Sequence, residues 1–590
     1  MKIALCQINT TVLDFKGNKE KIINSIKRVH KDGANFAVFP ELCITGYPPK
    51  DYLEYDHIIE KSNNVAQDIH NEVLKLSGDF TAIIGMPTKA PSGKGEDYEI
   101  ANTTTKTGTK PLYNSAVVLN NKCKYPDTVH KRLLPDNDEF NESRYFTPYN
   151  PHESVVPLQT ANGMNYGVLV CHDAWNDVTF WDDKILYYAG PVYKTMMNKP
   201  KVIFVINASP YTKTKPAFRE KMFSLLAKRH NVAFVYVNQV GGNDGLVFDG
   251  NSFVMGKHGA TLMRCEGFKE DEAIFEMGEW HKALPLYQDN ETVQLRNIRK
   301  ALVLGLKDYM RKTAGFTKVI VGNSGGIDSA VTLALCAEAI GPKNVISVSM
   351  PSTYSSDGSI RDAEQLAKNL GIKNHHLIPI NAVHNEFNKN IRDRFAYRNH
   401  AQIAPNNIAD ENIQARIRGN ILMWLSNAMN GALVVTTGNK SEVAVGYSTL
   451  YGDMCGGFNL LLDVSKMMVY DLAEDINTTH LEDSKPFSLV PVEIIKKEPS
   501  AELREGQVDQ DSLPPYKILD KIIEMFIEDK LWADQIAEKT GYDLVLVKKV
   551  VSLIVKNEFK RQQAAPGVKV TSKAFSAFVR QMPIAAKVEM

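Results

Sequence analysis

Short apolar runs separated by helical patterns fill roughly the first 265 residues of the chain. Each run is almost wholly apolar, which is typical of a strand that is buried on both faces. The segments between the runs have the wider spacing of amphipathic helices. The pattern predicts an α/β domain with strands at residues 36–40, 81–85, 114–119, 166–170, 201–207 and 232–239.

A second alternating region follows a charged stretch, FKEDEAIFEMGEWHKALPLYQDN, in which the apolar pattern fades. We therefore place a linker at 268–294, between domains at 1–267 and 295–590. In the second domain an apolar face recurs at helical spacing up to Gly371, which predicts a helix that stops there. Strand, helix and strand at this spacing predict a doubly wound parallel sheet. Its strands are expected at residues 318–321, 345–350, 375–380 and 432–438, and residues 516–557 are expected to be mainly helical.

Size, charge and cysteine usage narrow the class of protein. A chain of 590 residues is too long for one ordinary core, which agrees with two domains. Its formal net charge of +1 gives no overall attraction to nucleic acid or to an anionic membrane. We find no apolar run long enough to span a bilayer, and the first run, which ends before Gln7, is too short for a signal peptide. Seven dispersed cysteines without a C-x-x-C pair disfavour a disulfide framework or a zinc site and indicate a reducing cytoplasm.

The stretch VGNSGGIDS, residues 321–329, joins a predicted strand to a predicted helix. Its glycines allow the backbone to approach a ligand closely, and the free N–H groups of a helix that starts near Ile327 attract an anion. The usual triphosphate loop has a Lys after its glycines, whereas this loop has Asp328, an acid that could hold Mg²⁺. By itself the stretch could also be a simple turn between a strand and a helix.

A second polar turn favours the ligand-binding interpretation. The predicted strand at 432–438 ends in TTGNKSE, which delivers Thr437 and Glu442 within one turn. In a parallel sheet the carboxyl ends of both strands open on the same edge, where ligands bind.

The loop SGGIDS resembles the pyrophosphate loop of the N-type ATP pyrophosphatases, which split ATP between its α and β phosphates. Five ordered blocks narrow the resemblance to the NAD synthetase family and cover nearly all of residues 295–590: MPSTYSSDGSIRDAEQLAKNLGI, ENIQARIRGNILMWLSN, TTGNKSEVAVGYSTLYGDMCGGFNLLLDVSK, KEPSAELREGQVDQDSLPPYKILD and NEFKRQQAAPGVK. The resemblance implies that ATP adenylates the carboxylate of nicotinic acid adenine dinucleotide (deamido-NAD), pyrophosphate leaves, and ammonia forms the amide.

The resemblance also implies roles for single positions. Asp328 and Glu442 would hold Mg²⁺. ATP would be bound by Gly322, Asn323, Ser324, Gly325, Gly326, Ile327, Asp328, Ser329 and Thr437. Deamido-NAD would be bound by Asn412, Glu442, Thr449 and Lys560. Asn323 departs from the family, in which an apolar residue is more common.

Arg416 and Arg418 stand two residues apart and so point to different faces of a helix. One could reach a phosphate and the other a structural acid. Residues 531–562 also resemble two helices flanking a Gly, with a basic second helix. As a DNA-binding signal this is weak in a nearly neutral chain, and we interpret the segment as a helical subdomain that closes the synthetase site.

Three stretches of the first half are candidates for a site that supplies ammonia. Glu41 and Cys171 each follow a predicted buried strand, and Lys131 lies in a polar connection. Taken singly, each has a simpler interpretation as a turn acid, a surface charge or a small core residue. Their order and their contexts, FAVFPELCITGYPP, VHKRLLPDNDEFNESRYF and YGVLVCHDAW, resemble the nitrilase or carbon–nitrogen hydrolase family.

In that family a Cys attacks an amide or nitrile carbon, a Glu acts as base, and a Lys stabilises the oxyanion. The resemblance implies these roles for Cys171, Glu41 and Lys131, and we expect the Lys cation and the base to favour the thiolate. Glu142 is a candidate acid that orients Lys131.

The resemblance covers residues 1–267 and extends to the amide substrate. The stretch INASPYTKTK is similar to the glutamine-binding part of the amidotransferase members, with Ser209 and Lys215 at matching positions. His172 stands where the family usually has Glu, and Asn137 where a Tyr that contacts glutamine is common. These two departures leave the catalytic groups in place and concern the substrate pocket.

Together the resemblances imply a nitrilase-like α-β-β-α sandwich fused to a doubly wound parallel α/β domain of the adenine nucleotide alpha hydrolase type. The implied activity is glutamine-dependent NAD synthesis with ATP and Mg²⁺, in a cytoplasmic homo-oligomer that pairs through its synthetase domains and binds no nucleic acid or membrane. Three alternatives stay open. They are another ligase or thiolase of the pyrophosphate-loop group, an amidase with a nucleotide-sensing module, and an ammonia-using synthetase with a weakened glutaminase.

Overall fold

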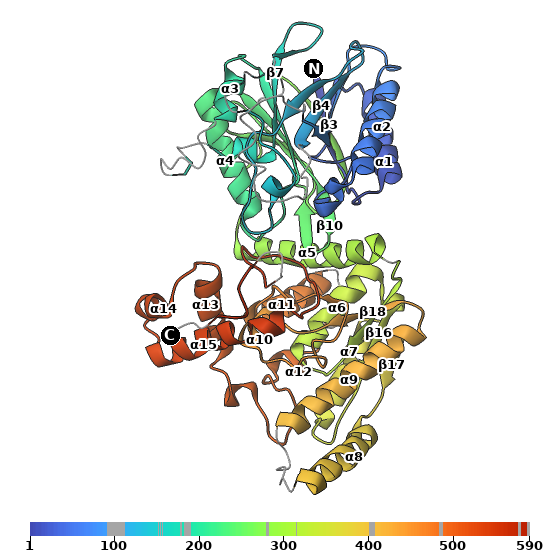
Figure 1. Ribbon diagram of the computed structural model, residues 1–590, viewed down its shortest axis with the longest axis vertical. Helices are drawn as coiled ribbons and strands as arrows, with labels where there is room; N and C mark the ends of the chain where they lie inside the picture. The colour runs from blue at the N-terminus through green and yellow to red at the C-terminus, as the bar shows by residue number, and fades with distance from the viewer. Residues whose placement is uncertain are drawn as a thin grey trace. The chain divides into compact units, whose positions relative to one another are not determined.

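The computed structural model describes residues 1–90, 112–150, 153, 155, 157–176, 180–181, 190–278, 283–313, 315–399, 408–482, 488–575 and 580–586 (Figure 1). They form two compact units. One unit comprises residues 1–243 and 247–290, and the other comprises residues 244–246 and 291–590. Among the described residues, no helix is long and apolar enough to cross a membrane.

The first unit contains two six-stranded sheets. One sheet has the order β14-β1-β2-β3-β4-β5, with strands Asp271–Glu276, Lys2–Gln7, Phe36–Val38, Thr81–Lys89, Leu112–Asn120 and Asp127–His130. The other has the order β13-β12-β9-β8-β7-β6, with strands Thr261–Arg264, Phe253–Met255, Ala233–Asn238, Val202–Asn207, Asn165–Val170 and Leu158–Gln159. Strands β10 (Val240–Asn243) and β11 (Leu246–Asp249) form a separate two-stranded sheet. All six strands predicted for this domain are present.

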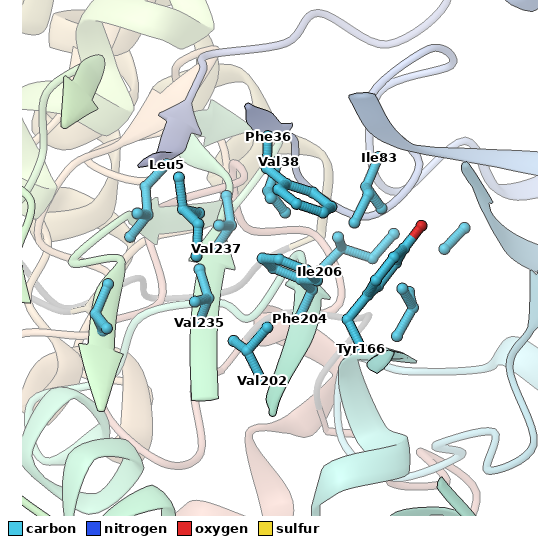
Figure 2. Close-up of a cluster of buried hydrophobic side chains, with 14 of the residues drawn as sticks. Leu5, Phe36, Val38, Ile83, Tyr166, Val202, Phe204, Ile206, Val235 and Val237 are labelled. Carbon is cyan, nitrogen blue, oxygen red and sulfur yellow. The ribbon is translucent and has the colours of Figure 1, made fainter. Parts of the chain in front are cut away.

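The two large sheets pack face to face through one set of alternating side chains (Figure 2). Leu5 and Val38 of the first sheet belong to the same buried cluster as Ile206 and Val237 of the second. The rings of Phe36 and Phe204 stack across this layer with centroids 4.9 Å apart. Because successive strand residues point to opposite faces, the intervening residues of each strand face outward, toward helices.

Helices cover both outer faces. On the first sheet, α1 (Phe15–Lys31) and α2 (Asp56–Val73) pack their apolar stripes on a cluster that includes Ala4 and Ile84. On the second sheet, α4 (Lys215–His230) and α3 (Pro191–Met196) pack against a cluster that includes Ile203 and Phe234. The expected α-β-β-α sandwich is confirmed.

The segment expected to be a linker, 268–294, contains a strand of the first unit. Strand β14 pairs antiparallel with β1 over its whole length, from Lys2 opposite Glu276 to Gln7 opposite Asp271. Four of its six residues are only partly buried, because it lies at the edge of the sheet, and its sequence DEAIFE lacks the apolar run of a central strand. Residues 271–276 therefore belong to the first unit and are not part of a linker.

The second unit is built on a five-stranded sheet in which every pair is parallel. Its order is β17-β16-β15-β18-β19, with strands Asn374–Leu377, Val345–Ser349, Lys318–Gly322, Ala432–Thr436 and Phe458–Asn459. The four predicted strands are confirmed, and the order reverses between β15 and β18, as in a doubly wound fold. The predicted helix before Gly371 is α7 (Asp357–Asn369).

Helices pack on this sheet and beside one another. Helix α9 (Ile408–Ala428) joins a buried cluster with residues of β15, β16 and β18. Helix α6 (Ile327–Ile340) contacts β15 and β16 and lies beside two further helices. These are α5 (Glu291–Lys312) and α11 (Lys466–Glu482). The remaining helices of this part are α8 (Asn381–Asn399) and α12 (Val492–Lys496).

The carboxy-terminal segment is helical, as predicted. Its helices are α13 (Tyr516–Ile527), α14 (Ala533–Thr540), α15 (Leu544–Lys556) and α16 (Glu558–Arg561). The first three share one apolar cluster with the short helix α10 (Lys440–Val445), which follows β18, and α16 contacts α10 and α15. This packing places the segment next to the turn that carries Glu442.

Candidate active sites

The three candidate catalytic residues of the first unit lie together at strand ends. Glu41 follows β2, Lys131 follows β5, and Cys171 opens a short 3₁₀ turn after β7. All three side chains are buried. Cys171 has a φ of 45°, a conformation that is unfavourable for a residue with a side chain and that clusters at functional sites.

Lys131 is the centre of this cluster. Its Nζ donates to Oε1 of Glu41 at 2.7 Å and to the two carboxylate oxygens of Glu142 at 2.9 and 2.8 Å. Burial alone would lower the pKa of Lys131, but the charges of Glu142 and Glu41 raise it well above its ordinary value. Burial raises the pKa of Glu142 to about 7, against the opposing charge of Lys131. Lys131 is therefore a permanent cation that two acids hold in place.

Replacing Glu142 with alanine is expected to lower the free energy of unfolding by about 3 kcal/mol or more, because it removes one partner of a buried charge. The matched control is Tyr47→Phe, which deletes only the hydroxyl that donates to Glu142 Oε1 at 3.1 Å. That change is expected to cost about 1 kcal/mol. Urea titration of both variants measures the difference, and equal losses would contradict the assignment.

Glu41 is placed to act on the thiol of Cys171. Its Oε1 accepts a hydrogen bond from Asn114 Nδ2 at 2.7 Å, and its Oε2 accepts one from the backbone N–H of Ala208 at 3.0 Å. Burial raises the pKa of Cys171 well above its ordinary value. The charge of Glu41 and a hydrogen bond to it raise this pKa further, while Lys131 opposes the shift. The thiol therefore has a pKa above its ordinary value and needs Glu41 as a base to form the nucleophile, while Lys131 favours the thiolate, as expected from the sequence.

The carboxylate of Asp173 joins the segments that carry Cys171 and Lys131. Its Oδ1 accepts the backbone N–H groups of Arg132 and Leu133, both at 2.9 Å, and its Oδ2 accepts that of Val170 at 3.3 Å. Asp173 is buried, and burial raises its pKa to about 6. One side chain thus fixes the relative position of the two segments, a link that the sequence pattern did not reveal.

The expected glutamine-binding residues lie around this cluster. The backbone N–H of Ser209, which is buried, donates to Asn238 Oδ1 at 2.8 Å. The Nζ of Lys215 lies 6.0 Å from the centroid of the Trp175 ring, and the His172 ring stacks on the same Trp at 6.0 Å. Burial, with the charges of Lys131 and Lys215, lowers the pKa of His172 to about 3, so this side chain is neutral.

Asn137, the other departure from the family, lies in the loop after Lys131. Its backbone carbonyl accepts the N–H of Phe140 at 3.0 Å, and the Phe140 ring lies 5.7 Å from Lys215 Nζ. Asn137 therefore helps to form the turn that places the Phe140 ring near Lys215.

In the second unit, residues 323–326, which we expect to bind phosphate and call the phosphate loop, connect β15 to α6, which begins at Ile327 as predicted. Gly325 has a φ of +74°, and a Cβ on it would lie 2.2 Å from the carbonyl oxygen of Ser359. Only glycine fits this close approach. The hydroxyls of Ser324 and Ser329 lie 3.1 Å apart across the loop.

Asp328 and Glu442 converge on one cation, Lys466. Lys466 Nζ donates to Asp328 Oδ2 at 2.6 Å and to Glu442 Oε1 at 3.1 Å. Asn439 donates to Asp328 Oδ1 at 2.8 Å and caps α10, which positions Glu442. Burial raises the pKa of Glu442 to about 8, with Lys466 opposing and Asp328 adding to the shift. Lys466 was missed from the sequence, because nothing in the spacing of LDVSK marks this Lys as a partner of Asp328, 138 positions away, or of Glu442, 24 positions away.

These groups line a cavity of about 300 Å³ at the carboxyl edge of the sheet. Of the expected ligand-binding residues, it is lined by Gly322, Asn323, Ser324, Gly326, Ile327, Asp328, Ser329, Thr437, Glu442 and Thr449. Gly325, Asn412 and Lys560 are not among the described lining residues. Asn412 instead accepts a hydrogen bond from the hydroxyl of Thr449 at 2.7 Å.

The ammonium of Lys560 donates to the carbonyl oxygens of Gly446 and Ser448, both at 2.8 Å. It therefore fastens the loop between Glu442 and Thr449. Arg418 lines the cavity and donates to the Met350 carbonyl, and burial lowers its pKa to about 10. Arg416 donates to the Leu450 carbonyl at 3.2 Å. The hydrogen bonds of Arg416 and Arg418 described by the structure go to backbone carbonyls, where the sequence had suggested an acid for one of them.

Comparison with known proteins gives the same division of the chain. The family model of carbon–nitrogen hydrolases matches residues 2–277, and that of NAD synthases matches residues 298–564. The fold and the two sites thus define an enzyme in which a carbon–nitrogen hydrolase and an NAD synthase share one chain.

Full-length relatives identify the family. The glutamine-dependent NAD(+) synthetase of a Synechocystis species is 40% identical, with 99% of this chain and 98% of the relative covered. That of Acinetobacter baylyi is 36% identical, with the same coverage. The solved structure of the Acinetobacter baumannii glutamine-dependent NAD+ synthetase, in complex with adenosine diphosphate, is 34% identical, covers 99% of this chain and 98% of its own, and has a TM-score of 0.71. A synthetase structure from Cytophaga hutchinsonii shares the fold, with a TM-score of 0.76, 19% identity and the same coverage. The chain belongs to the family of glutamine-dependent NAD(+) synthetases.

Proposed function

We propose that this chain hydrolyses glutamine at Cys171 and uses the ammonia to amidate deamido-NAD, which ATP has adenylated at the second site. The products are glutamate, NAD, AMP and pyrophosphate. The observation that carries the proposal is the meeting of Glu41, Lys131 and Cys171 in one buried cluster, in a chain that also holds a phosphate loop facing two acids.

At the first site, Glu41 accepts the thiol proton while the sulfur of Cys171 attacks the amide carbon of glutamine. The proton transfer and the attack occur together, because a buried thiol with a raised pKa is not ionised beforehand. The ammonium of Lys131 stabilises the oxyanion. The nitrogen leaves as ammonia after it receives the proton from Glu41, and water then cleaves the thioester to glutamate. Ser209 and Lys215 are proposed to hold the amino acid part of glutamine.

At the second site, the phosphate loop and the first turn of α6 are proposed to bind the phosphates of ATP. Asp328 and Glu442 fit a Mg²⁺ ion, because Mg²⁺ is commonly held by one or two carboxylates together with substrate phosphates. The proposal is supported by the ion pairs that both acids form with the ammonium of Lys466, which place their oxygens around one positive charge. When bound, Mg²⁺ would help to neutralise the charge of the departing pyrophosphate.

The side chains of the second site have further proposed roles. Thr437 is assigned to ATP, and Glu442 and Thr449 are assigned to deamido-NAD. Asn412 accepts a hydrogen bond from Thr449, and Lys560 holds the loop that precedes Thr449. Both are also proposed to contact deamido-NAD. The test of the whole reaction is the fate of the glutamine amide nitrogen, followed with a ¹⁵N label.

We also propose that the enzyme is a homo-oligomer that pairs through its synthetase domains. Val383, Phe387 and Ile391 stand four residues apart on α8 and are 53, 41 and 55% exposed. Such a stripe is the kind of surface that an interface between two copies buries.

Light scattering is expected to give a mass that is a multiple of the 65.9 kDa of one chain. A variant with Phe387→Asp and Ile391→Asp is expected to give a smaller particle, whereas Lys389→Glu, on the opposite face of the same helix, is expected to keep the size of the wild type. A wild-type mass of one chain would contradict this part of the proposal.

We also propose that the enzyme lies in the cytoplasm, in keeping with its seven free cysteines.

A further inference from the structure

Asn323 occupies the base of the phosphate loop, at the end of β15, and its side chain is fully engaged. It is 2% exposed. Its Oδ1 accepts the backbone N–H of Gly325 at 3.3 Å. Its Nδ2 donates to the hydroxyl of Ser347 at 3.1 Å and to the carbonyl oxygen of Ala363 at 3.0 Å. One buried amide therefore ties the loop to strand β16 and to helix α7.

The partners of Asn323 fix the orientation of its amide. A backbone N–H can only donate and a carbonyl oxygen can only accept, so the oxygen of Asn323 must face Gly325 and its nitrogen must face Ala363. The hydroxyl of Ser347 then accepts from Asn323, and it also shares a hydrogen bond with Nδ1 of His375, 3.0 Å away. The polar chain runs from the loop across β15 and β16 to His375 on β17.

The contact with Gly325 determines the shape of the loop. Gly325 packs against the Ser359 carbonyl, and its N–H turns inward to Asn323. The flanking N–H groups of Ser324 and Gly326 are held by loop hydroxyls at 3.3 and 3.2 Å. The acceptors of these two hydrogen bonds are hydroxyls, which phosphate oxygens can replace, whereas the acceptor of the Gly325 N–H is a buried amide that two further hydrogen bonds fix. The hydrogen bond from the Gly325 N–H to Asn323 keeps the N–H groups of Ser324 and Gly326 in position to bind phosphate oxygens.

We propose that Asn323 is the positioning residue of the ATP phosphate loop, and that its hydrogen bonds to Gly325, Ser347 and Ala363 hold the loop in the shape that binds phosphate. The proposal rests on the proposed function of this cavity as the ATP site. An apolar residue at this position would fill the space but would leave the N–H of Gly325 buried without an acceptor.

The test compares KM for ATP, kcat and the thermal midpoint of variants, with ammonium as nitrogen source. Asn323→Leu is expected to raise KM for ATP by about tenfold, because a buried hydrogen bond is lost, and to change kcat by less than about threefold. Asn323→Ser is expected to restore part of the KM, since a short hydroxyl can accept from the N–H two residues ahead. Ser347→Ala is expected to raise KM by a smaller factor.

The matched control is Ser349→Ala, because that hydroxyl donates to the backbone carbonyl of Asn323 at 2.9 Å and does not touch the amide. It is expected to leave KM for ATP unchanged. A lower thermal midpoint and kcat with an unchanged KM in both Asn323→Ser and Ser347→Ala would reduce Asn323 to a structural role and overturn the proposal. A wild-type enzyme that forms no NAD from ammonium would instead refute the proposed function of the cavity.

Discussion

Replacing Cys171 with alanine is expected to reduce NAD formation from glutamine by at least about a thousandfold, because no other group can take the place of the sulfur nucleophile. NAD formation from ammonium is expected to stay within a few fold of the wild type, because the phosphate loop and its acids belong to the other unit. The two rates are measured on the same preparation, with saturating glutamine or with ammonium.

The matched control for this variant is Cys265→Ala. Cys265 is also a buried cysteine of the first unit and lies in the core between the two sheets. Its loss is expected to lower stability slightly and to leave both nitrogen sources usable. If Cys171→Ala kept its activity with glutamine, the assignment of the nucleophile would be wrong.

Asp328→Asn is expected to reduce NAD formation from both nitrogen sources by at least about a hundredfold, because it removes a negative charge at the proposed site of Mg²⁺ and phosphate binding. The new amide would also set its own N–H groups against Lys466 or Asn439, both of which donate to Asp328. Removal of Mg²⁺ from the wild type with a chelator is expected to have the same effect.

Glu338→Gln is the control, because Glu338 lies on the same helix as Asp328 but forms a partly exposed ion pair with Arg299. A pair of this kind contributes about 1 kcal/mol or less, so activity is expected to be unchanged. Activity of Asp328→Asn close to that of the wild type would show that this acid does not serve the reaction.

The sequence was sufficient to predict the central strands and the position of the phosphate loop and of the polar turn after β18. Runs such as residues 202–207 and 432–436 are apolar enough to be predicted as buried strands. Gly325 lies at a close backbone approach that only glycine permits. Strand β14 was not predicted, because edge strands are partly exposed to solvent and the sequence of this one is acidic. Its pairing with β1 depends on backbone hydrogen bonds, which leave no apolar pattern.

Two side chains that hold the sites together, Lys466 and Asp173, could not be predicted, because their partners come from distant parts of the chain. Lys466 meets Asp328 across 138 positions, and Asp173 meets Arg132 across 41. The ionisation of Cys171 also depends on such contacts. From the sequence, Glu41 as a base and Lys131 as a cation were expected to favour the thiolate. In the structure Lys131 does lower the pKa of the Cys171 thiol, but burial and the charges of Glu41 and Glu142 raise it.

The central claim, that nitrogen from glutamine becomes the amide of NAD, is tested most directly with glutamine labelled with ¹⁵N in its side-chain amide. The purified chain is given this glutamine with ATP, Mg²⁺ and deamido-NAD, and the product is analysed by mass spectrometry. We predict NAD that carries the label in its carboxamide, with one AMP and at least one glutamate formed for each NAD. Glutamate released without labelled NAD or AMP would contradict the account and would leave an amidase beside a nucleotide-binding unit.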